Sequence, residues 1–309
     1  MKTSKVRRSS LLLVAALLLV LPARALAVTE ILVTNDDGPL GPGLQALVTA
    51  IQEIPDTDVQ VVVPSGNASG GGAGVTINAT FDVAFGVPLL GGVDTAITID
   101  SLKPADCVRW AVQELYGGVA PDYVLSGINQ GQNVGAAFGS GTVGGATQGN
   151  GMGARAIALS QAITLAPPLN LGLDVADYAA GAAFARNLVA TLIAGDPAVR
   201  LLERTFERGG LLNVQIPSHQ PVGVKVVKAA DTSDVFGPSL ITYVDQGGGT
   251  WSANVNLAVI DSHGPVFASH PLNDDAGPLA QDYVVIARWL PLHVARSAIA
   301  CRRCQSLLP

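Results

Sequence analysis

Short apolar runs alternate along the chain with longer segments in which apolar side chains recur at helical spacing. The runs predict buried strands at residues 31–33, 59–63, 123–125 and 156–160. The longer segments predict helices at residues 44–54, 104–116 and 139–153. Because strands and helices follow one another in turn, we expect βαβ units and a mostly parallel sheet.

The pattern changes towards the C-terminus. Residues 174–194 predict a long helix, and residues 211–216 predict a strand that ends at Pro217. Beyond Pro217 the segments look β-rich, at residues 222–227, 240–244 and 251–260. Residues 75–99 alternate weakly and predict hairpin-like strands. We therefore expect an α/β domain over residues 28–217 and a β-rich extension over residues 218–309.

The first 27 residues have the pattern of a signal peptide. Basic residues precede an apolar stretch at residues 11–21, and Ala25-Leu26-Ala27 forms a small-x-small cleavage site. The apolar stretch is too short for a membrane span, which needs about 20 residues. We expect cleavage before Val28 and export to the periplasm or the medium, with no membrane span afterwards. An uncleaved anchor is the alternative.

Removal of this segment makes the protein strongly acidic. The segment carries five basic residues and no acidic one, so the formal net charge changes from −6 to −11. Such a protein is a poor partner for a nucleic acid polymer, which is bound by basic patches. It would also repel an anionic substrate unless a metal ion supplied positive charge locally.

The three cysteines indicate no common site. Cys107 lies in a predicted helix, where we expect a small buried residue. Cys301 and Cys304 form a C-x-x-C pair near the C-terminus. In an exported protein this spacing favours a local disulfide, with half a zinc site or a redox pair as the alternatives.

Polar residues follow three of the predicted strands. Asn35, Asp36 and Asp37 end the first, Ser69 lies in a glycine-rich loop after the second, and Asn129 follows the strand at residues 123–125. Since the carboxyl ends of parallel strands meet at one edge of a sheet, these side chains should lie close together. All are oxygen donors and no histidine precedes residue 219, so the set favours Mg²⁺ or Mn²⁺ over zinc or copper.

A further loop adds a candidate anion site. Gly139-Ser140-Gly141-Thr142-Val143 leads into a predicted helix. Its hydroxyls, its backbone N–H groups and the positive end of the helix dipole could bind a phosphate.

Taken together, these motifs resemble the SurE family of metal-dependent 5′/3′-nucleotidases. The matching stretches keep the family's order and spacing from residue 31 to about residue 160. They are residues 31–38, residues 62–64 with Ser69-Gly70, residues 104–108, 121–122 and 126–129, Gly131 with Asn133, and residues 140–143. Further along the chain, residues 212–214 before Pro217 also match.

The resemblance implies a Rossmann-like three-layer α/β/α fold whose β-rich C-terminal extension serves to form a homodimer or homotetramer. It implies that Mg²⁺ or Mn²⁺ is bound by Asp36, Asp37, Ser69 and Asn129. Asp36 and Asp37 would be catalytic, with Asp36 nearest the chemistry as ligand, proton acceptor or nucleophile. The phosphate pocket would be lined by Asn35, Gly38, Asn133, Ser140, Gly141 and Thr142.

We therefore expect an exported phosphomonoesterase that acts on nucleoside 5′/3′-monophosphates or related phosphate esters. Three positions depart from the family pattern. Ser65 and Gln148 each stand where an acidic residue is usual, and Ala68 stands where an arginine is usual. They motivate an alternative, a SurE-like protein that binds metal and nucleotide with reduced catalysis. A structural oligomer with a vestigial site is the third hypothesis.

Overall fold

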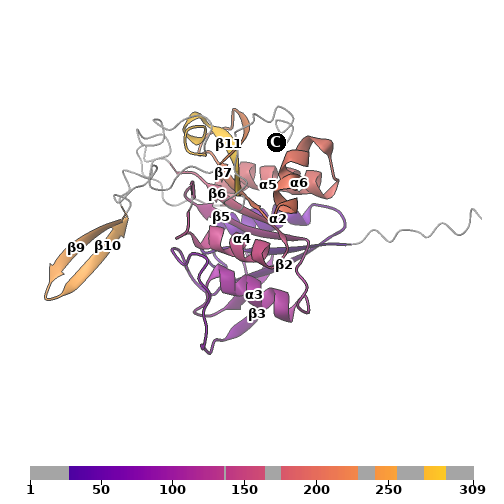
Figure 1. Ribbon diagram of the computed structural model, residues 1–309. Coiled ribbons are helices and arrows are strands. Elements are labelled where there is room, and N and C mark those ends of the chain that lie inside the picture. The colour runs from indigo at the N-terminus through magenta and orange to yellow at the C-terminus, as the bar shows by residue number, and fades with distance from the viewer. Residues whose placement is uncertain (1–27, 136, 164–174, 229–240, 256–274, 290–309) are drawn as a thin grey trace, which may run out of the picture.

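The computed structural model describes residues 28–135, 137–163, 175–228, 241–255 and 275–289. Within these ranges one large sheet runs through the molecule, with helices on both of its faces (Figure 1). The predicted signal peptide and the Cys301–Cys304 pair lie outside the described residues.

The large sheet has nine strands in the order β3-β4-β2-β1-β5-β6-β7-β11-β8. Neighbours from β4 to β7 are parallel, β3 and β11 run antiparallel to β4 and β7, and β8 is parallel to β11. The predicted mostly parallel α/β sheet is thereby confirmed. The strands are β1 (Thr29–Thr34), β2 (Thr57–Pro64), β3 (Val83–Pro88), β4 (Thr95–Ile99), β5 (Tyr123–Gln130), β6 (Arg155–Gln161), β7 (Leu211–Ile216), β8 (Gly223–Lys228) and β11 (Tyr283–Trp289).

Helices cover the two faces of this sheet in pairs. On one face α2 (Pro42–Gln52) packs against α5 (Ala179–Ile193), and on the other α3 (Pro104–Glu114) packs against α4 (Gly141–Gly151). A short helix α6 (Arg200–Glu207), which the apolar pattern did not predict, adds Leu202 to the core beside α5. The described residues also include the 3₁₀ turns η2 (Val175–Tyr178), η3 (Pro197–Val199) and η6 (Leu279–Gln281).

Strand β1 shows how the two cores form. Ile31 and Val33 face the α2/α5 core, whereas Leu32 between them faces the α3/α4 core, and all three are fully buried. A strand that is apolar on both faces suits the middle of a parallel sheet. Each such side chain contributes about 1.5–3 kcal/mol when it leaves water.

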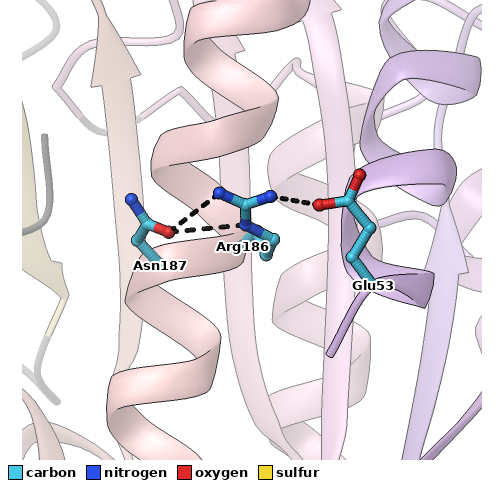
Figure 2. Close-up of polar contacts among 3 residues, drawn as sticks. All are labelled: Glu53, Arg186 and Asn187. Carbon is cyan, nitrogen blue, oxygen red and sulfur yellow. Dashed lines mark hydrogen bonds and ion pairs between the residues drawn. The ribbon is translucent and has the colours of Figure 1, made fainter. Parts of the chain in front are cut away.

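At the surface, an ion pair joins the two helices of one layer. Arg186 of α5 reaches Glu53, just past the end of α2, and also contacts its neighbour Asn187 (Figure 2). Both charged side chains are at least a third exposed. Such a pair contributes about 0–1 kcal/mol, so the α2–α5 packing rests on its apolar contacts.

The chain beyond Pro217 returns to the large sheet. Strands β8 and β11 are part of it, and Val226 and Ile286 complete its core. The change of pattern at Pro217 therefore does not mark an edge of the sheet. The part of the extension that stands apart is a separate two-stranded hairpin of β9 (Ile241–Gly247) and β10 (Thr250–Val255) (Figure 1).

The order of the strands creates a crevice beside β1. The chain runs from β1 to β2 on one side and later returns to place β5 on the other side. In open α/β sheets, ligands bind at such a switch point, outside the carboxyl ends of the strands. Among the described helices, none combines the length and apolar character needed to cross a membrane.

Candidate functional site

Three loops meet at the carboxyl ends of β1, β2 and β5. The loop after β2 is tied to the β1 loop by a hydrogen bond from the Ala68 N–H to the Asp36 carbonyl oxygen (2.7 Å). The same loop is tied to the turn before α4, because the Gly72 N–H donates to the Gly139 carbonyl oxygen (3.1 Å). The loops that the sequence analysis grouped at one edge are thus joined by direct hydrogen bonds.

Asp36 is buried and held by the first turn of α4. The Thr142 N–H donates to Asp36 Oδ2 (3.2 Å) and the Thr142 hydroxyl to Asp36 Oδ1 (2.7 Å). The Gly141 N–H donates to the same carboxylate. Burial raises the pKa of Asp36, and these hydrogen bonds act in the opposite direction.

The anion at the N-terminus of α4 is therefore the Asp36 carboxylate. The Ser140 hydroxyl accepts from the Val143 N–H (3.2 Å) and caps the helix. The helix dipole and the N–H groups of Gly141 and Thr142 stabilise a negative charge there. Since Gly141 and Thr142 bind this carboxylate, their clearest role is to position it, and direct phosphate contacts from residues 140–142 stay a prediction.

Asp37 lies next to Asp36 and is less deeply buried. Burial and the charge of Asp36 raise its pKa to about 6, while a hydrogen bond from the Gln130 N–H lowers it. The bond to Gln130 places the Asp37 carboxylate at the end of β5, next to Asn129. Two adjacent carboxylates with raised pKa values are the arrangement that a bound cation would stabilise.

Asn35 and Gly38 shape the turn that carries the two aspartates. The Asn35 amide donates to the Gly38 carbonyl oxygen (3.1 Å), and its Oδ1 accepts from the Gly38 N–H (3.2 Å). Asn35 is fully buried, and Gly38 has a positive φ of 80°. These two hydrogen bonds hold the turn. A direct contact of Asn35 or Gly38 with phosphate stays a prediction.

Asn129 and Ser69 present free oxygen atoms. Asn129 donates its amide N–H groups to the carbonyl oxygens of Gln130 (3.2 Å) and Gly131 (2.8 Å). Its Oδ1 has no hydrogen bond within the described part of the chain. The Ser69 side chain is exposed, and its backbone N–H donates to Asn67 Oδ1 (3.0 Å). Both oxygens are available as ligands.

Asn133 is tied into the sheet. Its N–H donates to Gln215 Oε1 (2.8 Å), and its carbonyl oxygen accepts from Asn213 (2.7 Å) and Gln215 (3.1 Å). Its side-chain amide donates to the Ser160 hydroxyl (3.0 Å). These contacts fix the loop that follows Asn129, and a contact of Asn133 with phosphate stays a prediction.

The donor set fits a hard divalent cation. It consists of the Asp36 and Asp37 carboxylates, the Asn129 amide oxygen and the Ser69 hydroxyl. Oxygen ligands with room for water are what Mg²⁺ and Mn²⁺ prefer. Across the described residues, no cluster of three or more histidine, cysteine, aspartate or glutamate side chains could hold a metal ion, so this mixed set is the candidate for such a site.

Sequence reasoning missed the role of Asn213, Gln215 and Tyr178. Asn213 and Gln215 carried a visible signal, because they are polar residues alternating with apolar ones on a strand that is buried throughout. Tyr178 carried none. Its ring packs at Gly43 of α2, and burial and then the nearby Asp37 raise its pKa. It therefore borders the two-aspartate turn from the α2/α5 side.

Comparisons with known proteins show which family the chain resembles in sequence. The family described as "Survival protein SurE" matches residues 31–235. The 5′-nucleotidase SurE of Caulobacter vibrioides (strain NA1000 / CB15N) is 36% identical over 202 residues, which cover 64% of this chain and 68% of that protein. The 5′-nucleotidase SurE of Symbiobacterium thermophilum is 34% identical over 200 residues, which cover 64% and 70%.

The fold agrees as well. The crystal structure of the SurE protein from Aquifex aeolicus superimposes with a TM-score of 0.62 at 25% sequence identity, and covers 84% of this chain and 93% of that one. The matched region contains both aspartates, the glycine-rich loop and the first turn of α4. By sequence and by fold, this chain belongs to the SurE family.

Proposed function

We propose that the protein is an exported, divalent-metal-dependent phosphomonoesterase that hydrolyses nucleoside 5′/3′-monophosphates or related phosphate esters. The observation that carries the proposal is the joining of three strand-end loops around Asp36 and Asp37. Family membership supports the same reaction, since the relatives compared above are 5′-nucleotidases.

Asp36, Asp37, Ser69 and Asn129 would hold Mg²⁺ or Mn²⁺. When bound there, the ion would supply a Lewis acid for a phosphate oxygen or a water molecule. The chain's own residues do the positioning. Thr142 fixes both oxygens of Asp36, and the carbonyl groups of Gln130 and Gly131 orient the Asn129 amide so that its oxygen is free. A site held this firmly loses little free energy to reorganisation during the reaction.

The test is a phosphate-release assay on residues 28–309 with nucleoside monophosphates and Mn²⁺ or Mg²⁺. We expect release that EDTA abolishes and added metal restores. Asp36→Asn should lower activity by at least about 100-fold, because it removes a charge from the donor set. Asp58→Asn, at the exposed start of β2, is the matched control and should match the wild type. Release that persists after EDTA and in Asp36→Asn would contradict the proposal.

The alternative hypothesis, a SurE-like protein with reduced catalysis, predicts different results. In that case calorimetry would show metal-dependent nucleotide binding, and a broad panel of phosphate esters would give no phosphate release. This pair of results would identify a binding protein and not a phosphatase. A lack of metal binding would instead favour the structural oligomer.

Export rests on the basic, apolar and small-residue pattern of residues 1–27. We expect the protein recovered from the periplasm or medium of an expressing cell to begin at Val28 when its N-terminus is sequenced. Replacing Leu17 and Leu18 by Asp breaks the apolar stretch and should leave the full-length chain inside the cell. A protein that is never processed or exported would contradict this part of the proposal.

A further inference from the structure

The candidate site brings negative charge together. Asp36 and Asp37 are adjacent, and a phosphate monoester is itself an anion. The N–H groups of Gly141 and Thr142 that could attract phosphate already donate to Asp36. A substrate therefore needs a source of positive charge beside the metal ion.

Lys103 lies along the glycine-rich loop after β2. A Cβ on Gly71 would lie 3.2 Å from Lys103 Cγ and 3.3 Å from its Cδ, and a Cβ on Gly74 would lie 3.1 Å from its Nζ. The stem of the lysine thus rests against the backbone at Gly71 and its ammonium lies at Gly74. Side chains at these two positions would displace it, so the glycines leave the space that the lysine occupies.

A buried carboxylate anchors both the lysine and the loop. Asp106 accepts hydrogen bonds from the N–H and the hydroxyl of Thr76 (2.7 and 2.8 Å), at the end of the loop. It also accepts from the Lys103 N–H (3.2 Å). The other end of the loop is fixed by Ala68 on Asp36 and by Gly72 on Gly139. The side chain of Lys103, which directly precedes α3, therefore lies against a loop with fixed ends that also carries Ser69.

Lys103 takes part in no ion pair within the described residues. The ion pairs found within the described residues are Arg186–Glu53 and His219–Asp282, neither of which includes Lys103. Two other basic side chains lie elsewhere: Arg186 is on the outside of α5, and Lys225 lies over the Tyr283 ring on β11. A half-buried ammonium without a carboxylate partner can take an anionic ligand.

We propose that Lys103 is a substrate-binding residue, whose ammonium draws the phosphate group of the substrate to the rim formed by Asp36, Asp37 and Ser69. This deepens the proposed phosphomonoesterase function and rests on it. Lys103 supplies binding and long-range attraction, and it takes no part in bond making.

The test compares Lys103→Met, Lys103→Arg and Lys225→Met with the wild type. Methionine keeps an unbranched apolar stem against Gly71 and removes the charge, and arginine keeps the charge. We expect Lys103→Met to raise KM about tenfold with kcat within about twofold, and to weaken the dependence of kcat/KM on ionic strength. Lys103→Arg should stay within about threefold of the wild type, and Lys225→Met should not change KM.

A second readout does not depend on turnover. Calorimetry with inorganic phosphate, in the presence of saturating Mn²⁺, should show about tenfold weaker binding to Lys103→Met than to the wild type. If the wild type releases no phosphate, the proposed function fails, and the phosphate titration still decides the role of Lys103. Equal phosphate affinity in both proteins would overturn the inference. The inference would also be overturned if both Lys103→Met and Lys103→Arg lost Mn²⁺ affinity and thermal stability. Such a loss would show that Lys103 has a structural role.

Discussion

At the scale of single residues, the decisive feature is how Asp36 is stabilised while buried. A carboxylate loses hydration when it is buried, which raises its pKa and disfavours its charged form. Here the first turn of α4 replaces part of that hydration through Thr142 and Gly141. The site therefore depends on how closely the backbone of Gly141 approaches Asp36.

That close approach leads to a prediction for Gly141→Ala. The added Cβ would lie 2.8 Å from Asp36 Cβ and from its Oδ2, so the carboxylate must move. We expect kcat/KM to fall by about 100-fold, as a displacement near 1 Å can cause, with weaker Mn²⁺ binding. Gly139→Ala is the matched control because a Cβ there would meet no atom within 4 Å. Wild-type kinetics in Gly141→Ala would refute this account of the turn.

A second prediction concerns the metal-free protein and pH. The pKa of Asp37 is about 6 in the folded state against 3.8 as its ordinary value. Between these values the folded state binds more protons than the unfolded state, so the free energy of unfolding should fall as pH rises from about 4 to about 6. Asp37→Asn should remove this contribution. Urea unfolding in EDTA, at several pH values, measures the difference between the two proteins. A difference that does not vary with pH would contradict the assignment.

At the scale of elements, the loops of the site are held by strands far away in the sequence. Asn133 is 82 residues from Gln215, yet the two exchange hydrogen bonds across the end of β7. The apolar pattern predicts that residues 211–216 form a strand. It does not tell which loop the polar side chains of that strand meet, since this depends on the order of the strands.

The amide cluster can be tested with Asn213→Leu. The change removes the hydrogen bond to the Asn133 carbonyl oxygen (2.7 Å) and the acceptor for Gln215 (2.9 Å). Because buried polar groups then lack partners, we expect the free energy of unfolding to drop by about 1–3 kcal/mol. Mn²⁺ affinity should drop too, since Asn129 lies at the end of β5, where this loop begins. Gln113→Leu, on the exposed side of α3, is the control. An unchanged urea midpoint in Asn213→Leu would contradict this role.

At the scale of the whole molecule, the described strands β9 and β10 form a sheet of their own, apart from the large sheet. Its exposed side chains include Tyr243 (69%) and Trp251 (61%). A two-stranded hairpin is marginally stable by itself in water, and clustered exposed apolar residues mark an interaction surface. We therefore propose that the hairpin mediates self-association.

For this reason we predict a homodimer or homotetramer in solution. Light scattering coupled to size exclusion should give a multiple of the chain mass for the wild type. Tyr243→Ser combined with Trp251→Ser should lower that mass, because it removes both exposed rings. Phe85→Ser is the control, as it replaces an exposed ring on β3. A monomeric wild type would refute the prediction, as would a double variant that keeps the wild-type mass.

By itself, the sequence determined the type of fold and the candidate residues of the site. Strand and helix periodicities are local properties, so the β and α segments from β1 to β7 could be predicted, with α6 the exception. Its eight residues are too few for the apolar repeat to stand out. The oxygen-rich strand ends were also readable, because the residue types alone restrict the metal.

The tertiary structure decided which groups meet. It showed that Thr142, 106 residues from Asp36, binds the carboxylate where a phosphate was expected. It returned β8 and β11 to the large sheet, and it placed the Lys103 side chain against the loop that carries Ser69. Each of these is a contact between segments distant in sequence, which depends on strand order and on the closeness of backbones. Local pattern carries no record of either, and so the sequence predicted the candidate residues of the site while the fold assigned their neighbours.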